Sequence, residues 1–184
     1  MNDIGSNGGG LFFVYGYGRT CKTFMWKMLS SKISSYNDIV LNITSSGIAS
    51  LLLPGGRPTH SRFAIPLSLN EDYIPHVIYR KAVTLLIDEL IIMSKLIIWD
   101  KALMTHKHYF ETLDKTMRDL LRFATPGSAE KTFGERTIVL GSDFKQILPV
   151  IPKATRPVVV LANINSSYMW TNCKVLRLTN NLRL

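Results

Sequence analysis

The chain has 184 residues, 46% hydrophobic and 19% charged, and its 22 basic residues against 13 acidic ones give a formal net charge of +9. This composition excludes a disordered tail, and the length suits one domain. No apolar run approaches the ~20 residues of a membrane span, and no secretory signal follows Met1, so we expect an intracellular protein without a membrane partner. Two cysteines are too few for a disulfide framework or a four-cysteine zinc site. The positive charge favours an anionic partner, nucleic acid first.

Short apolar runs recur along the chain and are typical of strands buried on both faces. They occupy residues 11–15, 38–43, 96–99, 137–140 and 175–178. Helices are predicted at residues 23–33, 81–93 and 106–123, and a loop that opens a further helix at residues 44–47. This alternation predicts an α/β fold with a mainly parallel sheet flanked by helices.

The remaining segments read as irregular structure. Residues 1–10 are polar and rich in glycine, which predicts a flexible lead-in. Residues 54–75 are rich in proline, glycine and serine and are predicted to form an irregular functional loop, and residues 124–135 a linker. Residues 158–161 are ambiguous, because their β-branched side chains favour a strand while the sequence after them favours a loop or helix.

A phosphate-binding loop is predicted between the first strand and the first helix. Its residues are Gly16, Tyr17, Gly18, Arg19, Thr20, Cys21, Lys22 and Thr23. The pattern of a phosphate loop is glycine, four residues, glycine, lysine, and serine or threonine, so that backbone N–H groups surround a phosphate at a helix N-terminus. Lys22 would reach the β- and γ-phosphates of ATP, and the Thr23 hydroxyl would bind Mg²⁺.

One residue of this loop departs from the pattern. Cys21 stands where the second glycine belongs. A side chain there either crowds the phosphate or forces a backbone angle that cysteine tolerates poorly.

Nearly the whole chain, from about Gly9 to Leu184, resembles the petite-integration-frequency (Pif-type) DNA helicases, a branch of superfamily one with helicase-like members in plants. Besides the phosphate loop, the resemblance rests on four further ordered blocks. They are residues 45–49 (SSGIA) with 54–63 (PGGRPTHSRF), 96–100 (LIIWD) with 104–108 (MTHKH), 141–149 (GSDFKQILP) and 178–184 (LTNNLRL).

The resemblance implies a P-loop NTPase fold with a RecA-like sheet, and a 5′-to-3′ helicase that couples ATP hydrolysis to DNA unwinding in repair, recombination and telomere maintenance. Family members have two RecA-like domains with ATP between them. Residues 11–184 would supply the first, and the second is expected to be missing. The family's glutamine-containing segment for adenine recognition has no counterpart before Gly8. A nuclear location is expected from the DNA partner.

Catalytic roles follow by resemblance at four positions. Lys22 would contact the phosphates, Asp100 would hold Mg²⁺ opposite Thr23, Gln146 would sense the γ-phosphate beside Asp143, and Arg183 would stabilise charge on the transferred phosphoryl group. Family members carry a glutamate after the metal-binding aspartate, and this chain has Lys101. Because an ammonium group cannot accept the attacking water's proton, hydrolysis is expected to be impaired.

Contacts with single-stranded DNA are implied for a second group of residues, in which hydroxyls and cations face phosphates and rings offer stacking surfaces. These residues are Ser45, Ser46, Arg57, His60, Arg62 and Phe63.

Three alternatives stay open. Asp88 and Glu89 also follow an apolar run and would be the metal ligand and base if the register differed. The chain could instead be a degenerate helicase copy that binds nucleic acid or a protein partner without hydrolysis. It could also be an unrelated phosphate-loop ATPase or kinase, which would be indifferent to DNA. Neither the residues nor the resemblance indicates an oligomeric state.

Overall fold

The computed structural model describes residues 9–18, 20–63, 88–145 and 148–179. Within them, six parallel strands form one sheet in the order β3-β2-β4-β5-β1-β6. The strands are β1 (Leu11–Tyr15), β2 (Ile39–Thr44), β3 (Arg57–Pro58), β4 (Ser94–Asp100), β5 (Thr137–Ser142) and β6 (Cys173–Arg177). The predicted α/β fold with a parallel sheet is confirmed, and each of the five predicted apolar runs forms a strand.

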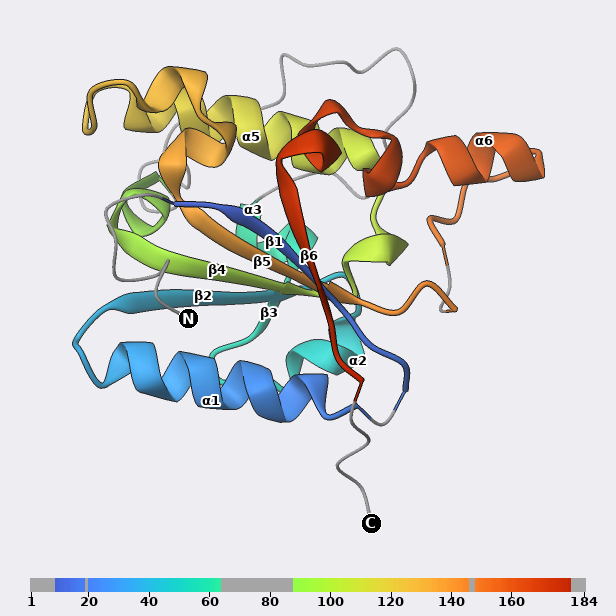
Figure 1. Ribbon diagram of the computed structural model, residues 1–184, viewed down its shortest axis with the longest axis horizontal. Helices are drawn as coiled ribbons and strands as arrows, with labels where there is room; N and C mark the ends of the chain where they lie inside the picture. The colour runs from blue at the N-terminus through green and yellow to red at the C-terminus, as the bar shows by residue number, and fades with distance from the viewer. Residues whose placement is uncertain (1–8, 19, 64–87, 146–147, 180–184) are drawn as a thin grey trace.

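Helices cover both faces of the sheet (Figure 1). The helices are α1 (Lys22–Ser34), α2 (Gly47–Ser50), α3 (Thr59–Phe63), α5 (Lys107–Leu121) and α6 (Arg156–Leu161). On the face of α1, Trp26 and Ile33 pack against Val14, Ile98 and Val139. On the face of α5, a larger core contains Phe13, Trp99, Phe110 and Leu113 among others. The two central strands β4 and β5 are buried almost throughout, which explains their continuous apolar sequence.

The strand order places β5 between β1 and β4. Parallel strands end at the same edge of the sheet, so the residues that follow β1, β4 and β5 gather at its carboxyl edge. That edge therefore holds the phosphate loop, Asp100 and Asp143. Among the described helices, none is long and apolar enough to cross a membrane.

Three predictions of local structure need correction or completion. Residues 54–63 are not all irregular, because Arg57–Pro58 pairs with β2 as β3 and α3 follows directly. The ambiguous residues 158–161 are helical, in α6, where Pro157 stands in the first turn, a position that suits proline. The predicted linker at 124–135 contains two 3-10 turns, Ser128–Glu130 and Thr132–Glu135.

The predicted lead-in and the second helix lie only partly within the described residues. Residues 1–8 lie outside them, whereas the Gly10 carbonyl already accepts a hydrogen bond from the Ile138 N–H, at 2.9 Å. Of the predicted helix 81–93, residues 88–93 are described and are helical, and residues 64–87 lie outside.

Candidate nucleotide site at the carboxyl edge of the sheet

The phosphate loop leads from the end of β1 into α1, as predicted. Lys22 is the first residue of α1 and is buried, and its Nζ donates to the carbonyls of Gly16 and, at 3.1 Å, Tyr17. The Thr20 hydroxyl donates to the same Tyr17 carbonyl at 2.8 Å. Gly16 is required here, because a Cβ would lie 2.4 Å from Thr20 Oγ1. The lysine thus lies against its own loop, where a phosphate would give it a stronger, charged partner.

Cys21 adopts a left-handed backbone, with φ of 54° and ψ of 32°, immediately before α1. Of the two expected consequences of a cysteine here, crowding of the phosphate or an unfavourable backbone angle, the unfavourable backbone angle is observed. For a residue with a Cβ this region costs roughly 1–2 kcal/mol, whereas glycine enters it freely. Cys21 is therefore strained in a backbone conformation that glycine would adopt without strain.

Asp100 ends β4 beside this loop. It is 5% exposed, and its Oδ1 accepts a hydrogen bond from Trp26 Nε1 at 3.1 Å. Trp26 reaches it by lying over Gly141, where a Cβ would be 2.2 Å from the indole ring. A tryptophan on α1 and a glycine on β5 thus hold the carboxylate in place.

Asp143 follows β5 and is also buried. Its Oδ1 accepts a hydrogen bond from the Lys145 N–H at 2.9 Å, which closes a tight turn after the strand. Asp143 and Asp100 both act on the Lys22 ammonium and raise its pKa, while burial, the largest influence, and Lys101 lower it. The net result is a Lys22 pKa below the usual value. Because Asp100 is among the groups that influence this pKa, the predicted catalytic residues Lys22 and Asp100 lie close enough to interact electrostatically.

Lys101 occupies the position directly after β4, with a left-handed φ of 57°. Its influence on the Lys22 pKa places its positive charge near the phosphate loop. A cation there would attract the negative charge of a nucleotide, but at neutral pH it cannot act as the base that accepts a proton from the attacking water.

The alternative pair does not share this position. Asp88 and Glu89 lie in the helical segment 88–93 that precedes β4, away from a strand's carboxyl end. Burial raises the pKa of Asp88. The structure therefore contradicts the alternative register and supports Asp100.

The chemistry of the predicted metal ligands suits Mg²⁺. Thr23 is the second residue of α1, directly after the lysine that faces Asp100. A hydroxyl and a carboxylate are hard oxygen donors, and Mg²⁺ usually takes only one or two protein ligands with phosphates and water. No cluster of three histidine, cysteine, aspartate or glutamate side chains occurs in the described ranges. Arg19, Gln146 and Arg183 lie outside the described residues.

The predicted DNA-contact residues form two groups. Ser45 and Phe63 face the interior around Trp99: the indole Nε1 donates to Ser45 Oγ at 2.9 Å, and the two rings have centroids 6.0 Å apart. Ser45 Oγ also contacts Thr105 Oγ1 at 2.5 Å. Ser46 caps α2, with its hydroxyl accepting from the Ala49 N–H at 3.5 Å.

The second group is basic and faces outward. Arg57 and His60 are exposed, and Arg62 is half-buried. Burial lowers the pKa of Arg62 the most, and the nearby charge of Arg57 lowers it further. Within the described part of the chain, Arg62 Nε is buried without a hydrogen-bond partner. Arg57 and Arg62 supply the positive charge expected for phosphate contacts.

Two features of the edge were missed by sequence reasoning. One is the role of Trp26, whose indole donates a hydrogen bond to Asp100. Its place four residues after Lys22 on the same helix face was the available signal. The other is an aromatic group formed by Tyr15, Tyr17 and Phe144, whose ring centroids lie 5.1–5.4 Å apart.

The whole chain, residues 1–184, matches the model of the PIF1-like helicase family. The chain belongs to the PIF1-like helicase family. This membership excludes the alternative of an unrelated phosphate-loop ATPase or kinase. No curated protein matches the chain at a significant level.

Solved Pif1 helicases share its fold. Bacteroides Pif1 in complex with ADP-AlF3 and single-stranded DNA superposes with a TM-score of 0.75 and 22% identity, over 98% of this chain and 40% of that chain. Bacteroides Pif1 bound to single-stranded DNA gives 0.73 and 22%, over 94% and 39%. Candida albicans Pif1 gives 0.67 and 21%, over 96% and 37%. The chain spans about 40% of the length of these helicases, and its fold is their RecA-like fold.

Proposed function

We propose that this chain binds Mg²⁺-ATP and single-stranded DNA as the first RecA-like motor domain, residues 11–184, of an ATP-dependent 5′-to-3′ DNA helicase. The observation that carries the proposal is the convergence of Lys22, Asp100 and Asp143 at the carboxyl edge of a parallel sheet, in a member of the PIF1-like helicase family. Related Pif1 structures contain single-stranded DNA and ADP-AlF3. Unwinding in repair, recombination and telomere maintenance, and a nuclear location, are part of the same proposal.

The residues of the chain supply binding and positioning in this proposal. Lys22 exchanges its loop carbonyls for the phosphates, and the N-terminus of α1 directs its N–H groups at them. Thr23 and Asp100 hold Mg²⁺, which when bound neutralises charge on the transferred phosphoryl group. Arg57, His60 and Arg62 attract the DNA backbone.

A second function is favoured by Lys101 and Cys21 together. The first places an ammonium where the family has its base, and the second puts strain into the phosphate loop. A PIF1-like domain that binds nucleotide and DNA but hydrolyses ATP very slowly would have both features.

ATP turnover with and without single-stranded DNA separates the two functions. We expect slow turnover by the natural chain, and a Cys21→Gly, Lys101→Glu double variant that is faster by about 10²–10⁴-fold and stimulated by DNA. The control is Cys21→Gly, Lys101→Gln, which removes the charge without adding a base. Turnover of the glutamate variant no faster than this control would contradict a motor that lacks only its base.

A further inference from the structure

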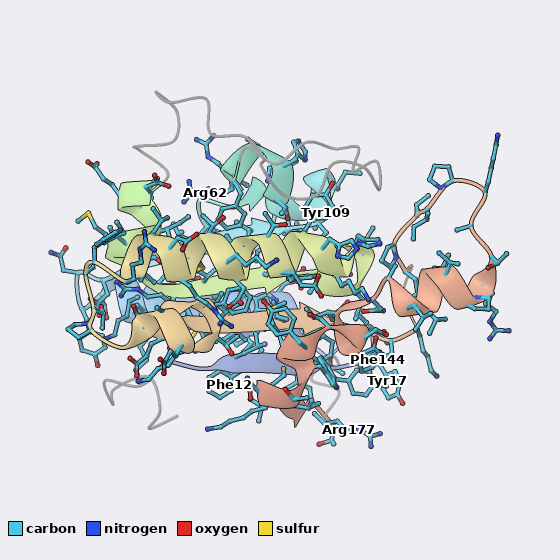
Figure 2. All side chains as sticks on the ribbon, turned by 90° about the horizontal axis from the view of Figure 1, so that it is seen from above. Phe12, Tyr17, Arg62, Tyr109, Phe144 and Arg177 are labelled. Atoms are coloured by element: carbon cyan, nitrogen blue, oxygen red, sulfur yellow. The ribbon has the colours of Figure 1, made fainter. Side chains whose placement is uncertain are left out.

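A cluster of rings and cations lies at the carboxyl edge beside the nucleotide site, and its side chains have no role in the site described above. We call it the tyrosine shelf: Tyr15, Tyr17, Phe144, Lys145 and Arg177, from the ends of β1, β5 and β6. Tyr15 lies between the other two rings, with centroids 5.4 Å from Tyr17 and 5.1 Å from Phe144. Figure 2 shows Tyr17, Phe144 and Arg177 close together at one end of the sheet.

The outer rings of the shelf remain accessible while their positions are constrained. Tyr17 is 39% exposed and Phe144 42% exposed. Lys145 Nζ lies 4.8 Å from the centroid of the Tyr17 ring. A hydrogen bond from Tyr15, together with Lys145 and Arg177, lowers the pKa of the Tyr17 phenol, which places both cations beside this ring. Exposed rings held between two cations are the elements with which proteins bind unpaired bases and their phosphates.

The inner ring of the shelf, Tyr15, and the helix that follows the phosphate loop lie on different faces of the sheet. Tyr15 packs with Phe13 and Phe110 in the core under α5, whereas Trp26 of α1 packs in the core of the opposite face. Phe63, next to the basic residues His60 and Arg62, packs against the same α5-side core as Tyr15. The shelf thus shares a face with the predicted DNA contacts, and this favours a base of the DNA strand over the base of the bound nucleotide.

We propose that the tyrosine shelf is a stacking subsite for one unpaired base of single-stranded DNA, with Lys145 and Arg177 contacting its flanking phosphates. This inference rests on the proposed function, because it extends the DNA path from the ends of β2 and β3 across the carboxyl edge to β6. The Tyr17 ring supplies the stacking surface, and its phenol keeps the ring in place.

Binding of a fluorescent oligothymidine to the full chain, measured by anisotropy over a salt series, tests the subsite. Tyr17→Ala is expected to weaken binding by about 5- to 150-fold without changing the salt dependence, since it removes a ring and no charge. Tyr17→Phe keeps the ring and is expected to retain most of the affinity. Arg177→Ala is expected to weaken binding and to reduce the slope of log K against log salt by about 0.7, the effect of one phosphate contact.

Controls on α1 and just after its end distinguish this subsite from general charge and exposure. Tyr36→Ala removes a ring that is more exposed than Tyr17, 69% against 39%, and Lys27→Ala removes an exposed cation; both are expected to leave DNA binding unchanged. Equal effects of Tyr17→Ala and Tyr36→Ala would overturn the subsite. So would an Arg177→Ala variant that loses affinity for ATP rather than for DNA, because the shelf would then serve the nucleotide base.

The outcomes also separate this inference from the proposed function. If the natural chain binds DNA and Arg57→Ala weakens binding while the shelf variants do not, the subsite is wrong and the proposed function stands. If the natural chain does not bind oligothymidine at low salt, both are wrong.

Discussion

Two buried polar clusters on opposite faces of the sheet each contain a charged side chain, and they differ in the hydrogen-bond partners of that side chain. On α5, the fully buried Asp114 accepts from the Phe133 N–H at 2.5 Å and the Tyr168 hydroxyl at 2.6 Å, and pairs with Arg118 at 2.8 Å. At the carboxyl edge, Lys22 lies against carbonyls of its own loop, and burial lowers its pKa.

The difference separates a structural cluster from a binding site. The partners of Asp114 come from three segments of the chain, and all of them would lose their acceptor if the carboxylate were removed. This carboxylate therefore holds α5 to the 3-10 turns that pack against the helix. The partners of Lys22 are neutral carbonyls within six residues of it, and a phosphate would stabilise the same ammonium more strongly. A buried charge whose hydrogen-bond partners come from distant parts of the chain indicates a structural role. A buried charge whose hydrogen-bond partners all belong to its own loop indicates a ligand site.

The comparison predicts its largest effect at Asp114. Asp114→Ala leaves Arg118, the Tyr168 hydroxyl and the Phe133 N–H without their acceptor, and we expect a loss of about 3–5 kcal/mol in the free energy of unfolding. Urea unfolding followed by circular dichroism measures it. The control is Asp119→Ala on the same helix, whose exposed pair with Arg122, at 3.9 Å, is expected to contribute under about 1 kcal/mol. Similar losses in the two variants would show that Asp114 is no structural anchor.

A smaller effect is expected for the partner of Asp100. Trp26→Phe removes the indole donor to a buried carboxylate, and hydrogen bonds to charged groups contribute about 1.5–3 kcal/mol. We expect a loss of stability in that range and a higher Mg²⁺ concentration for half-maximal nucleotide binding. Trp170→Phe, a partly buried ring change on the other face, serves as the control. An unchanged Mg²⁺ requirement in Trp26→Phe would separate the tryptophan from the metal site.

Relief of strain at Cys21 is expected to be worth less. Cys21→Gly enters the left-handed region freely, so we expect the free energy of unfolding to rise by about 1 kcal/mol. The control is Lys27→Gly in the interior of α1, where introducing glycine should instead destabilise the protein by about 1 kcal/mol. A Cys21→Gly variant that loses stability would show that the loop is not strained there.

The smallest effect concerns the pH range of nucleotide binding. Lys101 lowers the Lys22 pKa, so Lys101→Gln is expected to raise it. Because phosphate binding needs the protonated ammonium, affinity is lost as pH rises through this pKa, and the variant should retain affinity to a higher pH. Titrations of nucleotide binding between about pH 7 and 10 measure the shift. Lys95→Gln, at the opposite end of β4, should leave the profile in place, and a shift of equal size there would refute the local effect.

Much of the fold was predictable because burial on both faces makes each central strand a continuous apolar run, as in residues 96–99 and 137–140. The strand Arg57–Pro58 was not, since two residues leave no periodic pattern and the segment before them, Pro54 to Gly56, consists of proline and glycine. Residues 158–161 were ambiguous because β-branched side chains favour strands locally, while the proline in the first turn of α6 suits a helix.

The site was predictable where a residue's place in a motif sets its neighbours. Asp100 and Asp143 lie at the carboxyl ends of two strands, and Lys22 ends the loop that follows a third, so parallel order brings them together. The contact of Trp26 with Asp100 depends on Gly141 leaving room for an indole, which is a property of three dimensions. Ser45 likewise carried a motif signal for DNA, but its hydroxyl is engaged by Trp99 and Thr105, and no spacing in the sequence indicates that pair.

The most direct test of the account is a calorimetric titration of the full chain with Mg²⁺-ATP, with and without single-stranded DNA. The account predicts micromolar binding that DNA enhances, and at least tenfold weaker binding in a folded Lys22→Ala variant. No binding to the folded natural chain at millimolar nucleotide, or equal affinity in the Lys22→Ala variant, would contradict a nucleotide site at the carboxyl edge.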